Sequence, residues 1–356
     1  MSLKVLESFD WLESNDFPAG YGAITPYLGS LPQIVSGGRN GGNCLSVTPN
    51  RSANFGDLSG GGIAPGVAAG GEIIVGFSLK FTNVGTGAIT FLGISSEIGT
   101  QFNLILVRTI GGVISVWSGA TDGGGTPVIL GTCKTLIAQG IWYTVEVKML
   151  PHATTGYVEV RVNGIPELSL TNVDTFGSNN GHALVVFGAN RNTPTILYDD
   201  VYICDDQGGL HDDFLGDCEV RQLKPNGNGN ASDFVGSDGN STDNYLLVDE
   251  APAVDDDSTY TQSSTSGHQD LYTYGDLPAY ATDVIGCEVK TVAKKVDAGA
   301  ANLKAVCRSN AVESDIELGI NTSYSCKRAI YGQNPDGPTG WTVTTLNAAE
   351  FGVERA

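Results

Sequence analysis

Apolar and polar residues alternate with a period of two along several stretches of the first 206 residues. In IIVGFSLKF, residues 73–81, the apolar side chains fall on one face of an extended chain, and Ser78 and Lys80 fall on the other. The stretches YTVEVKML (143–150) and YVEVRV (157–162) repeat the pattern. Half-buried strands of antiparallel sheets are expected to show this alternation.

A tight turn follows the third of these stretches. Asn163-Gly164 suits the two positive φ values of a type I′ turn, so 157–162 and the returning IPELSL (165–170) are predicted to form a hairpin. No stretch before residue 200 has a helical period. Short strands joined by polar turns predict a sandwich or barrel. Further strands are expected at AITFLGI (88–94), FNLILVRT (102–109), VISVWSG (113–119), ALVVFGA (183–189) and ILYDDVYI (196–203).

The amino-acid composition of the chain changes after about residue 206. The Gly-, Asn- and Asp-rich stretch 224–244 favours turns, and we predict a long loop there. Patterned strands return further on, and the tail 339–356 is expected to give one strand and a single helical turn. We predict a sandwich over residues 1–206 and a smaller β-rich, sandwich-like domain over 207–356. The strands of the second domain are expected at 284–295, 301–308 and 315–320.

Composition and charge agree with an all-β protein and exclude some partners. The chain has 41% hydrophobic and 16% charged residues, 48 glycines and a formal net charge of -20. Nucleic-acid binding needs clustered Lys and Arg, and an anionic membrane surface would repel this chain. Between residues 197 and 280, 18 Asp or Glu stand against only Arg221 and Lys224. The acidic charge is therefore concentrated in one region.

The chain begins without a readable secretory signal, and no apolar stretch is long enough to span a membrane. We therefore expect synthesis in a cytosol and no membrane insertion. The seven cysteines are an odd number without a Cys-x-x-Cys pair, which argues against a disulfide framework or a zinc site. Most are expected to be buried thiols. Oxidation of some of them in an assembled particle is the alternative.

Five stretches resemble the concanavalin A-like, laminin-G-like jelly-roll sandwich. The resemblance covers about the first 206 residues and implies a sandwich of two antiparallel sheets. The stretches are ESFDW (7–11), GGRNGGNCL (37–45), GIWYTVEVKM (140–149), GYVEVRVNG (156–164) and LYDDVYICDD (197–206).

Residues 199–356 resemble a region common in the virion proteins of tailed bacteriophages. This resemblance implies a structural component of the tail, the neck or collar, or the capsid decoration. It also implies synthesis in the bacterial cytoplasm, residence in the virion, and other virion subunits as partners, in a homo-oligomer such as a trimer or ring. The stretches that carry it are DDVYICDDQGG (199–209), DFLGDCEVRQLKPNG (213–227), NYLLVDE (244–250) and GWTVTTLNAAEFGVE (340–354).

The aspartates of LYDDVYICDDQGG (197–209) have three interpretations. In the first, Asp199 or Asp200 binds turn amides near Phe9 and Asp10, and the later aspartates are solvated linker residues. In the second, loop oxygens converge on a calcium ion. Paired-carboxylate catalysis is the third. The linker residues of the first interpretation are Asp205, Asp206, Asp212 and Asp213.

A second calcium candidate lies in the acidic region. Asp238, Asn240, Thr242 and Asn244 occupy positions 1, 3, 5 and 7 of a calcium-loop template, with Asp249 at position 12. Asp243 stands where the template requires glycine, and flanking helices are not expected. An ordinary Asn/Asp turn is the alternative, and no other cofactor is expected.

The sequence lacks the motifs that would indicate a catalytic site. Glycosidases of the concanavalin A-like fold are expected to carry Glu-x-Asp-x-Glu on one strand, whereas Glu146 and Glu159 each stand alone between valines, as on the solvent face of a strand. The chain also lacks the Gly-x-Ser-x-Gly motif of serine hydrolases, the phosphate-binding Gly-x-x-x-x-Gly-Lys loop and the His-Glu-x-x-His motif of zinc proteases. We therefore expect a protein that is not an enzyme.

A lectin-like protein that attaches to host cell-surface glycan is the alternative function. Exposed Trp rings can stack on sugar faces, and Trp11 and Trp117 are the preferred candidates. Trp341 is a further candidate, whereas Trp142 is expected to be part of the core because it adjoins a strand.

Overall fold

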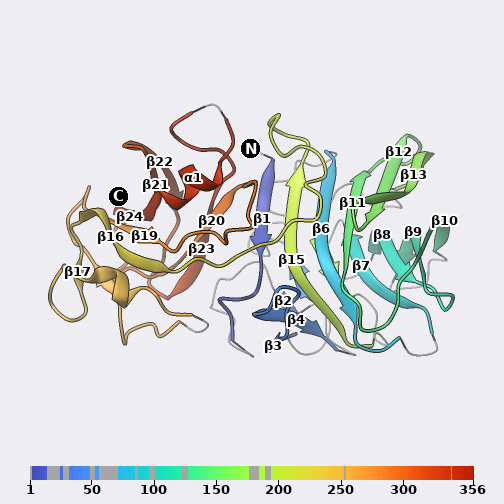
Figure 1. Ribbon diagram of the computed structural model, residues 1–356, viewed down its shortest axis with the longest axis horizontal. Helices are drawn as coiled ribbons and strands as arrows, with labels where there is room; N and C mark the ends of the chain where they lie inside the picture. The colour runs from blue at the N-terminus through green and yellow to red at the C-terminus, as the bar shows by residue number, and fades with distance from the viewer. Residues whose placement is uncertain are drawn as a thin grey trace. The chain divides into compact units, whose positions relative to one another are not determined.

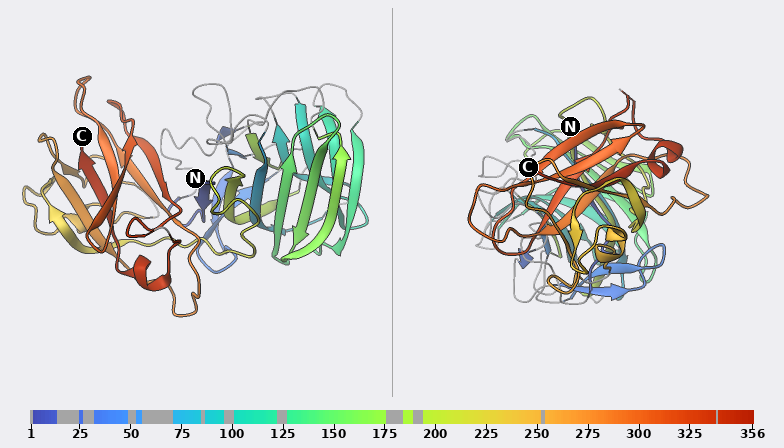
Figure 2. Two further views of the ribbon diagram at one scale, coloured as in Figure 1. Left: turned by 90° about the horizontal axis from the view of Figure 1, so that it is seen from above. Right: turned by 90° about the vertical axis from the view of Figure 1, so that its left-hand side faces the viewer.

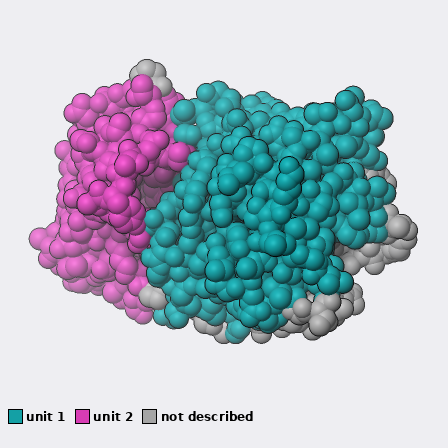
Figure 3. Space-filling view, turned by 45° about the vertical axis from the view of Figure 1, so that its right-hand side comes forward, with its two compact units in different colours: residues 1–15, 22–220 teal, residues 16–21, 221–356 magenta. Residues whose placement is uncertain are grey.

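The computed structural model places the chain in two compact units (Figure 3). Unit 1 comprises Met1–Asn15 and Gly22–Val220, and unit 2 comprises Asp16–Tyr21 and Arg221–Ala356. No helix among the described residues is long and apolar enough to cross a membrane. The structure describes residues 2–13, 25–26, 32–48, 53–55, 71–84, 87–95, 101–121, 127–175, 184–188, 194–251, 254–337 and 339–356.

Unit 1 is a sandwich of two antiparallel sheets (Figures 1 and 2). The larger sheet has the strand order β13-β12-β11-β6-β15-β4-β3, and β1 also pairs with β15. Its strands are β1 (Leu3–Glu7), β3 (Gln33–Ser36), β4 (Asn43–Val47), β6 (Ile73–Phe81), β11 (Tyr143–Leu150), β12 (Gly156–Val162), β13 (Ile165–Val173) and β15 (Ile196–Asp205).

The smaller sheet of unit 1 has the order β10-β9-β8-β7-β14-β5-β2. All the strands expected in the first domain are present, which confirms the prediction of an all-β sandwich. The strands β2, β5 and β10 of this sheet were not predicted, and neither were β1, β3 and β4 of the larger sheet. The strands of the smaller sheet are β2 (Thr25–Pro26), β5 (Ala53–Phe55), β7 (Ile89–Ser95), β8 (Gln101–Arg108), β9 (Val113–Thr121), β10 (Val128–Leu136) and β14 (Leu184–Phe187).

Aromatic side chains join the two sheets of unit 1. The Tyr198 ring from β15 lies 4.6 Å from the ring of Phe187 and 5.9 Å from that of Phe77, measured between centroids. The Tyr198 hydroxyl donates a 2.6 Å hydrogen bond to the Phe91 carbonyl of the opposite sheet. This hydroxyl is therefore satisfied although the side chain is fully buried.

Two central strands are buried on both faces, contrary to the half-buried strands that the alternation predicted. Every residue of β15 is buried, and in β6 only Lys80 is not. Ser78 and Glu146 were expected to face solvent, yet they are 0% and 1% exposed. The outer face of the larger sheet is therefore covered along β6, β11 and β15.

Unit 2 is built on a five-stranded sheet of order β16-β19-β24-β21-β22 and two separate strand pairs, β17-β18 and β20-β23. Trp341, Tyr331 and Phe351 lie together in its core. The helical turn and strand expected in the tail are confirmed. The elements are β16 (Pro225–Ser232), β17 (Val235–Gly236), η1 (Asn244–Leu247), β18 (Thr261–Gln262), β19 (Gln269–Tyr274), β20 (Cys287–Ala293), β21 (Leu303–Ser309), β22 (Val312–Leu318), β23 (Ser325–Tyr331), α1 (Val343–Asn347) and β24 (Glu350–Arg355).

The long loop expected over 224–244 is wrong for its first part, which forms β16. This edge strand pairs with β19 in an irregular register. Glycine suits one position in it, because a Cβ at Gly229 would lie 2.9 Å from the Leu271 carbonyl oxygen. Pairing with a neighbouring strand therefore overrides the local preference of this stretch for turns.

Candidate functional site

The segment 207–220, here called the strap, follows β15 and lies over the outer face of the larger sheet. The Gly216 amide donates to Glu146 Oε1 at 2.7 Å, and the Leu215 amide donates to the Tyr202 hydroxyl at 3.1 Å. The strap is part of unit 1, so the boundary between the units falls after Val220 and not at residue 206. The reason is that its backbone amides and carboxylates bind the sheet.

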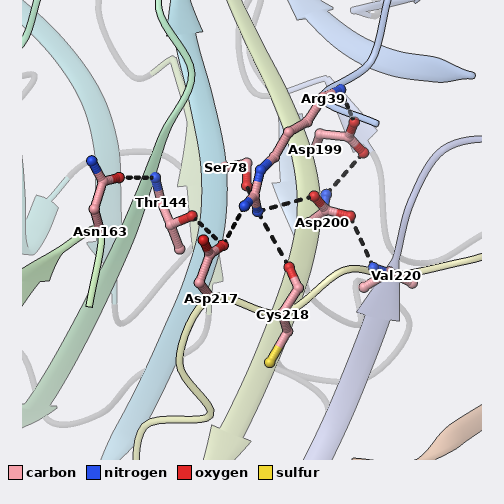
Figure 4. A network of polar contacts seen from close by, with 9 residues as sticks. All are labelled: Arg39, Ser78, Thr144, Asn163, Asp199, Asp200, Asp217, Cys218 and Val220. Carbon is pink, nitrogen blue, oxygen red and sulfur yellow. Dashed lines mark hydrogen bonds and ion pairs between the residues drawn. The ribbon is translucent and has the colours of Figure 1, made fainter. Parts of the chain in front are cut away.

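The guanidinium of Arg39 is the centre of the polar network between sheet and strap (Figure 4). Arg39 lies between β3 and β4. Its Nη2 pairs with Asp217 Oδ1 at 2.5 Å, and its Nη1 donates to Ser78 Oγ at 2.9 Å. Asp217 also accepts a 2.6 Å hydrogen bond from the Thr144 hydroxyl. One cation thus joins the loop after β3, the strand β6 and the strap.

Asp199 and Asp200 bind backbone amides, as the first interpretation predicted, but at other positions. Asp199 accepts from the Arg39 amide at 2.7 Å, and Asp200 accepts from the Val220 amide at 2.9 Å. The Phe9 amide is bound instead by Glu7. Asp200 has φ +49°, and the register of β15 shifts there, so both carboxylates fit into an otherwise apolar strand.

Burial controls the protonation of these two carboxyl groups. Burial, together with the charge of the adjacent Asp200, raises the pKa of Asp199 to about 8, although backbone hydrogen bonds lower it. Burial also raises the pKa of Asp200 to about 6, against the Val220 amide and the Arg39 charge, which lower it. At neutral pH the pair therefore carries a proton, which Asp199 holds more tightly than Asp200.

We predict that unit 1 becomes more stable as the pH falls from 8.5 to 5. Both carboxyl groups have a higher pKa in the folded chain than the ordinary value of about 3.9, so the folded state binds protons more tightly in this window. The stability that the two protonated carboxyl groups contribute is lost as the pH rises through their pKa values in the folded chain. Melting temperatures across the window measure the effect, and the Asp199→Asn variant should show a flatter profile. If the melting temperatures of the wild type and of Asp199→Asn changed equally with pH, the prediction would be contradicted.

Glu146 and Tyr202 form a second buried contact under the strap. The Tyr202 hydroxyl donates to Glu146 Oε1 at 2.5 Å, and both residues are 1% exposed. Gly76 on β6 makes room for the tyrosine ring, because a Cβ there would overlap it. The interpretation of Glu146 as a solvent-face residue is thus wrong, since the strap covers it.

The remaining aspartates of the opening cluster divide into one buried group and three at the surface. Asp205 was expected in a solvated linker, but it is 0% exposed and pairs with Lys4 at 3.0 Å. Asp212 and Asp213 are exposed and Asp206 is half-buried. Asp213 pairs with Lys148 at 3.3 Å. In the described ranges, no three His, Cys, Asp or Glu side chains are grouped so that they could hold a metal ion.

The calcium-loop residues form turns in unit 2. The Asn240 amide donates to Asp238 Oδ1 at 3.2 Å, and the Thr242 amide donates to Asn240 Oδ1 at 2.7 Å. Asp238, Asn240 and Thr242 are exposed, whereas Asn244 is 0% exposed. Asp249 lies beyond the short helix η1. The structure therefore keeps three of the template residues in one exposed turn and buries Asn244.

The tryptophans proposed for glycan stacking have different surroundings. Trp11 is half-buried, and its Nε1 donates to Glu7 Oε1 at 3.1 Å. Trp117 is half-buried on β9. Trp142, expected in the core, is only half-buried, and the Lys80 ammonium lies 4.7 Å from its ring centroid. Trp341 is 3% exposed and belongs to the core of unit 2, so its ring is not available to a sugar.

Five of the seven cysteines are buried, as expected, and Cys218 and Cys287 are partly buried. Burial raises the pKa of the Cys44 and Cys307 thiols to about 12. A thiol that stays protonated is a poor nucleophile. These two side chains therefore serve as packing groups.

Sequence reasoning missed Arg39, Tyr202 and Asp217 as members of the network. One signal was available: Gly76 interrupts an apolar strand, and a glycine inside a strand often marks a close approach by another group. The partners themselves lie more than 100 residues apart in several cases, and no local pattern links them.

No protein-family model matches the chain, and no curated protein matches it. Solved structures with some likeness include an endo-β-1,4-glucuronan lyase from the fungus Trichoderma reesei, with a TM-score of 0.37 and 13% identity over 56% of this chain and 98% of that chain. Domain 4 of the arabinanase AbnA from Geobacillus stearothermophilus has a TM-score of 0.36 and 19% identity over 57% of this chain and 92% of that domain. The carbohydrate-binding module CBM66 from Bacillus subtilis has a TM-score of 0.33 and 12% identity over 52% of this chain and 98% of that module. Likeness at this level assigns no function.

Proposed function

We propose that the chain is a non-enzymatic structural subunit of a tailed-bacteriophage virion that assembles with further copies of itself. The resemblance of residues 199–356 to phage virion proteins motivates the proposal. The observation that carries it is a group of exposed aliphatic side chains at one end of the sandwich, here called the apolar end. Its members are Ile110, Leu136, Ile141 and Ile165, which are 74%, 66%, 53% and 61% exposed.

Hydrogen bonds place these side chains at the same end. The Ile137 amide, next to Leu136, donates to the Gly112 carbonyl of the turn that contains Ile110. The Thr135 hydroxyl donates to Glu167, two residues after Ile165. The Tyr143 hydroxyl, two residues after Ile141, donates to the Leu136 carbonyl at 3.3 Å. Gathered aliphatic groups of this kind mark interaction surfaces.

Charge favours a second copy of the chain as the occupant. A protein with a net charge of -20 repels itself except through a surface that is poor in acid. Residues 101–143, which supply three of the four side chains, contain one acidic residue, Asp122, and two basic ones, Arg108 and Lys134. Glu167, two residues after Ile165, also lies at this end, where its carboxylate accepts hydrogen bonds from the Lys134 and Thr135 amides. Copies can therefore meet at the apolar end, as in a ring or trimer around a rotation axis.

We predict that Leu136→Asp weakens self-association about 10- to 100-fold, because burying an apolar side chain of this size contributes roughly 1.5–3 kcal/mol. Light scattering coupled to size-exclusion chromatography measures the effect over a concentration series. Val296→Asp is the control, since Val296 is 94% exposed and belongs to unit 2. A wild-type protein that stays monomeric at high concentration would refute self-association.

The virion role is tested by mass spectrometry of purified particles. Stoichiometric peptides of this chain are expected in intact virions after gradient purification and removal of loosely bound host proteins. Their absence would overturn the virion role whatever the oligomeric state of the isolated chain. A screen for turnover of polysaccharides tests the non-enzymatic part, which is supported by the engagement of the carboxylates of Asp199, Asp200 and Asp217 with protein donors.

Attachment to cell-surface glycan is the second candidate. Trp117 favours it, because its half-buried ring lies on β9 between Ile105 and Ile129, and Ile129 is 57% exposed. Indole rings beside apolar groups can stack on sugar faces. A glycan array probed with the wild-type protein and with Trp117→Ala distinguishes the two candidates. Binding that is lost in the variant supports attachment, and an array without signal rejects it.

A further inference from the structure

Unit 2 contains a buried polar cluster beside the turn that resembled a calcium loop. Asn228 and Ser232 lie on β16, Asp270 and Tyr272 lie on the neighbouring β19, and Asn244 begins η1. Asp270 and Asn244 are both 0% exposed. The cluster therefore holds one carboxylate and one amide group away from water, and Asn228 is partly buried beside them.

Hydrogen bonds connect the members of this cluster. Asn244 Nδ2 and the Tyr272 hydroxyl both donate to Asp270 Oδ2 at 2.7 Å. Ser232 lies opposite Asp270 in the pairing of β16 with β19, and its hydroxyl donates to the Ser241 carbonyl at 2.8 Å. Asn228 Nδ2 donates to Ser232 Oγ at 3.2 Å. Asn244 is thus bonded directly to Asp270, and Asn228 is bonded to Ser232, the residue opposite Asp270.

Three oxygen atoms of the cluster remain without a hydrogen-bond donor. They are Asp270 Oδ1, Asn244 Oδ1 and Asn228 Oδ1, and all three atoms are buried. The described residues also provide no Lys, Arg or His in an ion pair with Asp270. Burial raises the pKa of Asp270, and the donors on Oδ2 lower it. A buried acceptor without a donor is costly.

We infer that this cluster binds a hard cation, Ca²⁺, through Asp270, Asn244 and Asn228. Every unsatisfied atom is an oxygen acceptor, and a cation is the class of ligand that such atoms bind. Carboxylate and amide oxygens are ligands that Ca²⁺ accepts in flexible geometry, whereas Mg²⁺ demands a stricter octahedron and retains its waters. This site is separate from the exposed turn of Asp238 and Asn240, and the inference does not depend on the virion role.

The test is a melting experiment on the full chain with CaCl₂, MgCl₂ or EGTA. Ca²⁺ is expected to raise the melting temperature of unit 2 by roughly 5–10 °C once its free concentration exceeds the dissociation constant a hundredfold. Calorimetric titration with CaCl₂ gives the stoichiometry, expected to be one ion per chain. No shift and no binding heat at millimolar Ca²⁺ would overturn the inference and would leave water as the occupant.

Two variants separate this site from the exposed turn. Asp270→Asn removes the charge and places an N–H donor beside the bare oxygens, so the variant is expected to fold and to lose its response to Ca²⁺. Asp238→Asn is the matched control and should respond like the wild type. The opposite result, a response lost in Asp238→Asn and kept in Asp270→Asn, would assign the ion to the exposed turn and refute the buried site.

Discussion

Replacing Glu146 with alanine is expected to destabilise unit 1 by about 3 kcal/mol. The carboxylate accepts hydrogen bonds from the Tyr202 hydroxyl and from the Gly216 amide of the strap, and it is 1% exposed. Its removal leaves two donors without an acceptor under the strap. Chemical denaturation followed by tryptophan fluorescence measures the change in the free energy of unfolding.

Glu159→Ala is the matched control for this experiment. Glu159 has the same sequence surroundings, a glutamate between two valines, but it is only partly buried on β12. Its replacement is expected to change the free energy of unfolding by less than about 0.5 kcal/mol. Equal losses in the two variants would show that the strap does not depend on Glu146.

Gly76→Ala is expected to cost about 2–3 kcal/mol, because the added methyl group would overlap the ring of Tyr202. The ring is fixed between β6 and the strap, so it has little room to move. Loss of the Tyr202 contact to Glu146 should accompany the substitution. Hydrogen exchange of the Leu215 and Gly216 amides, which bind these two side chains, reports that loss directly.

Gly87→Ala provides the comparison, since nothing lies within 4 Å of a Cβ at that position. It should leave both stability and exchange close to those of the wild type. If Gly76→Ala behaved like Gly87→Ala, the close packing of Tyr202 on β6 would be wrong.

The fold class could be predicted from the sequence because alternation and turn residues are local signals. The hairpin at Asn163-Gly164 is an example: both residues have positive φ, and β12 pairs with β13 on either side of them. The strand β16 was missed for the opposite reason. Its glycines and asparagines favour turns, and only its pairing with β19 makes it a strand.

The site could be predicted only in part. Two aspartates inside the apolar strand β15 indicated a carboxylate that binds turn amides near Phe9 and Asp10; the carboxylates do bind amides, but those of Arg39 and Val220. Their partners could not be found, because the Arg39 amide is 160 residues from Asp199 and the contact depends on how the strands are ordered in the sheet. Glu146 was misinterpreted because an alternating pattern does not show whether another segment covers the polar face.

The strap has a practical consequence for any attempt to produce the sandwich by itself. A gene fragment that stops at codon 206 would strip the cover from Glu146 and Tyr202 and would remove the Asp217 carboxylate from Arg39. Such a truncated product would expose these side chains and the sheet face around them to solvent and would lose the contacts that hold them. Recombinant versions of the sandwich should therefore terminate at Val220, fourteen residues beyond the point that the acidic sequence suggests.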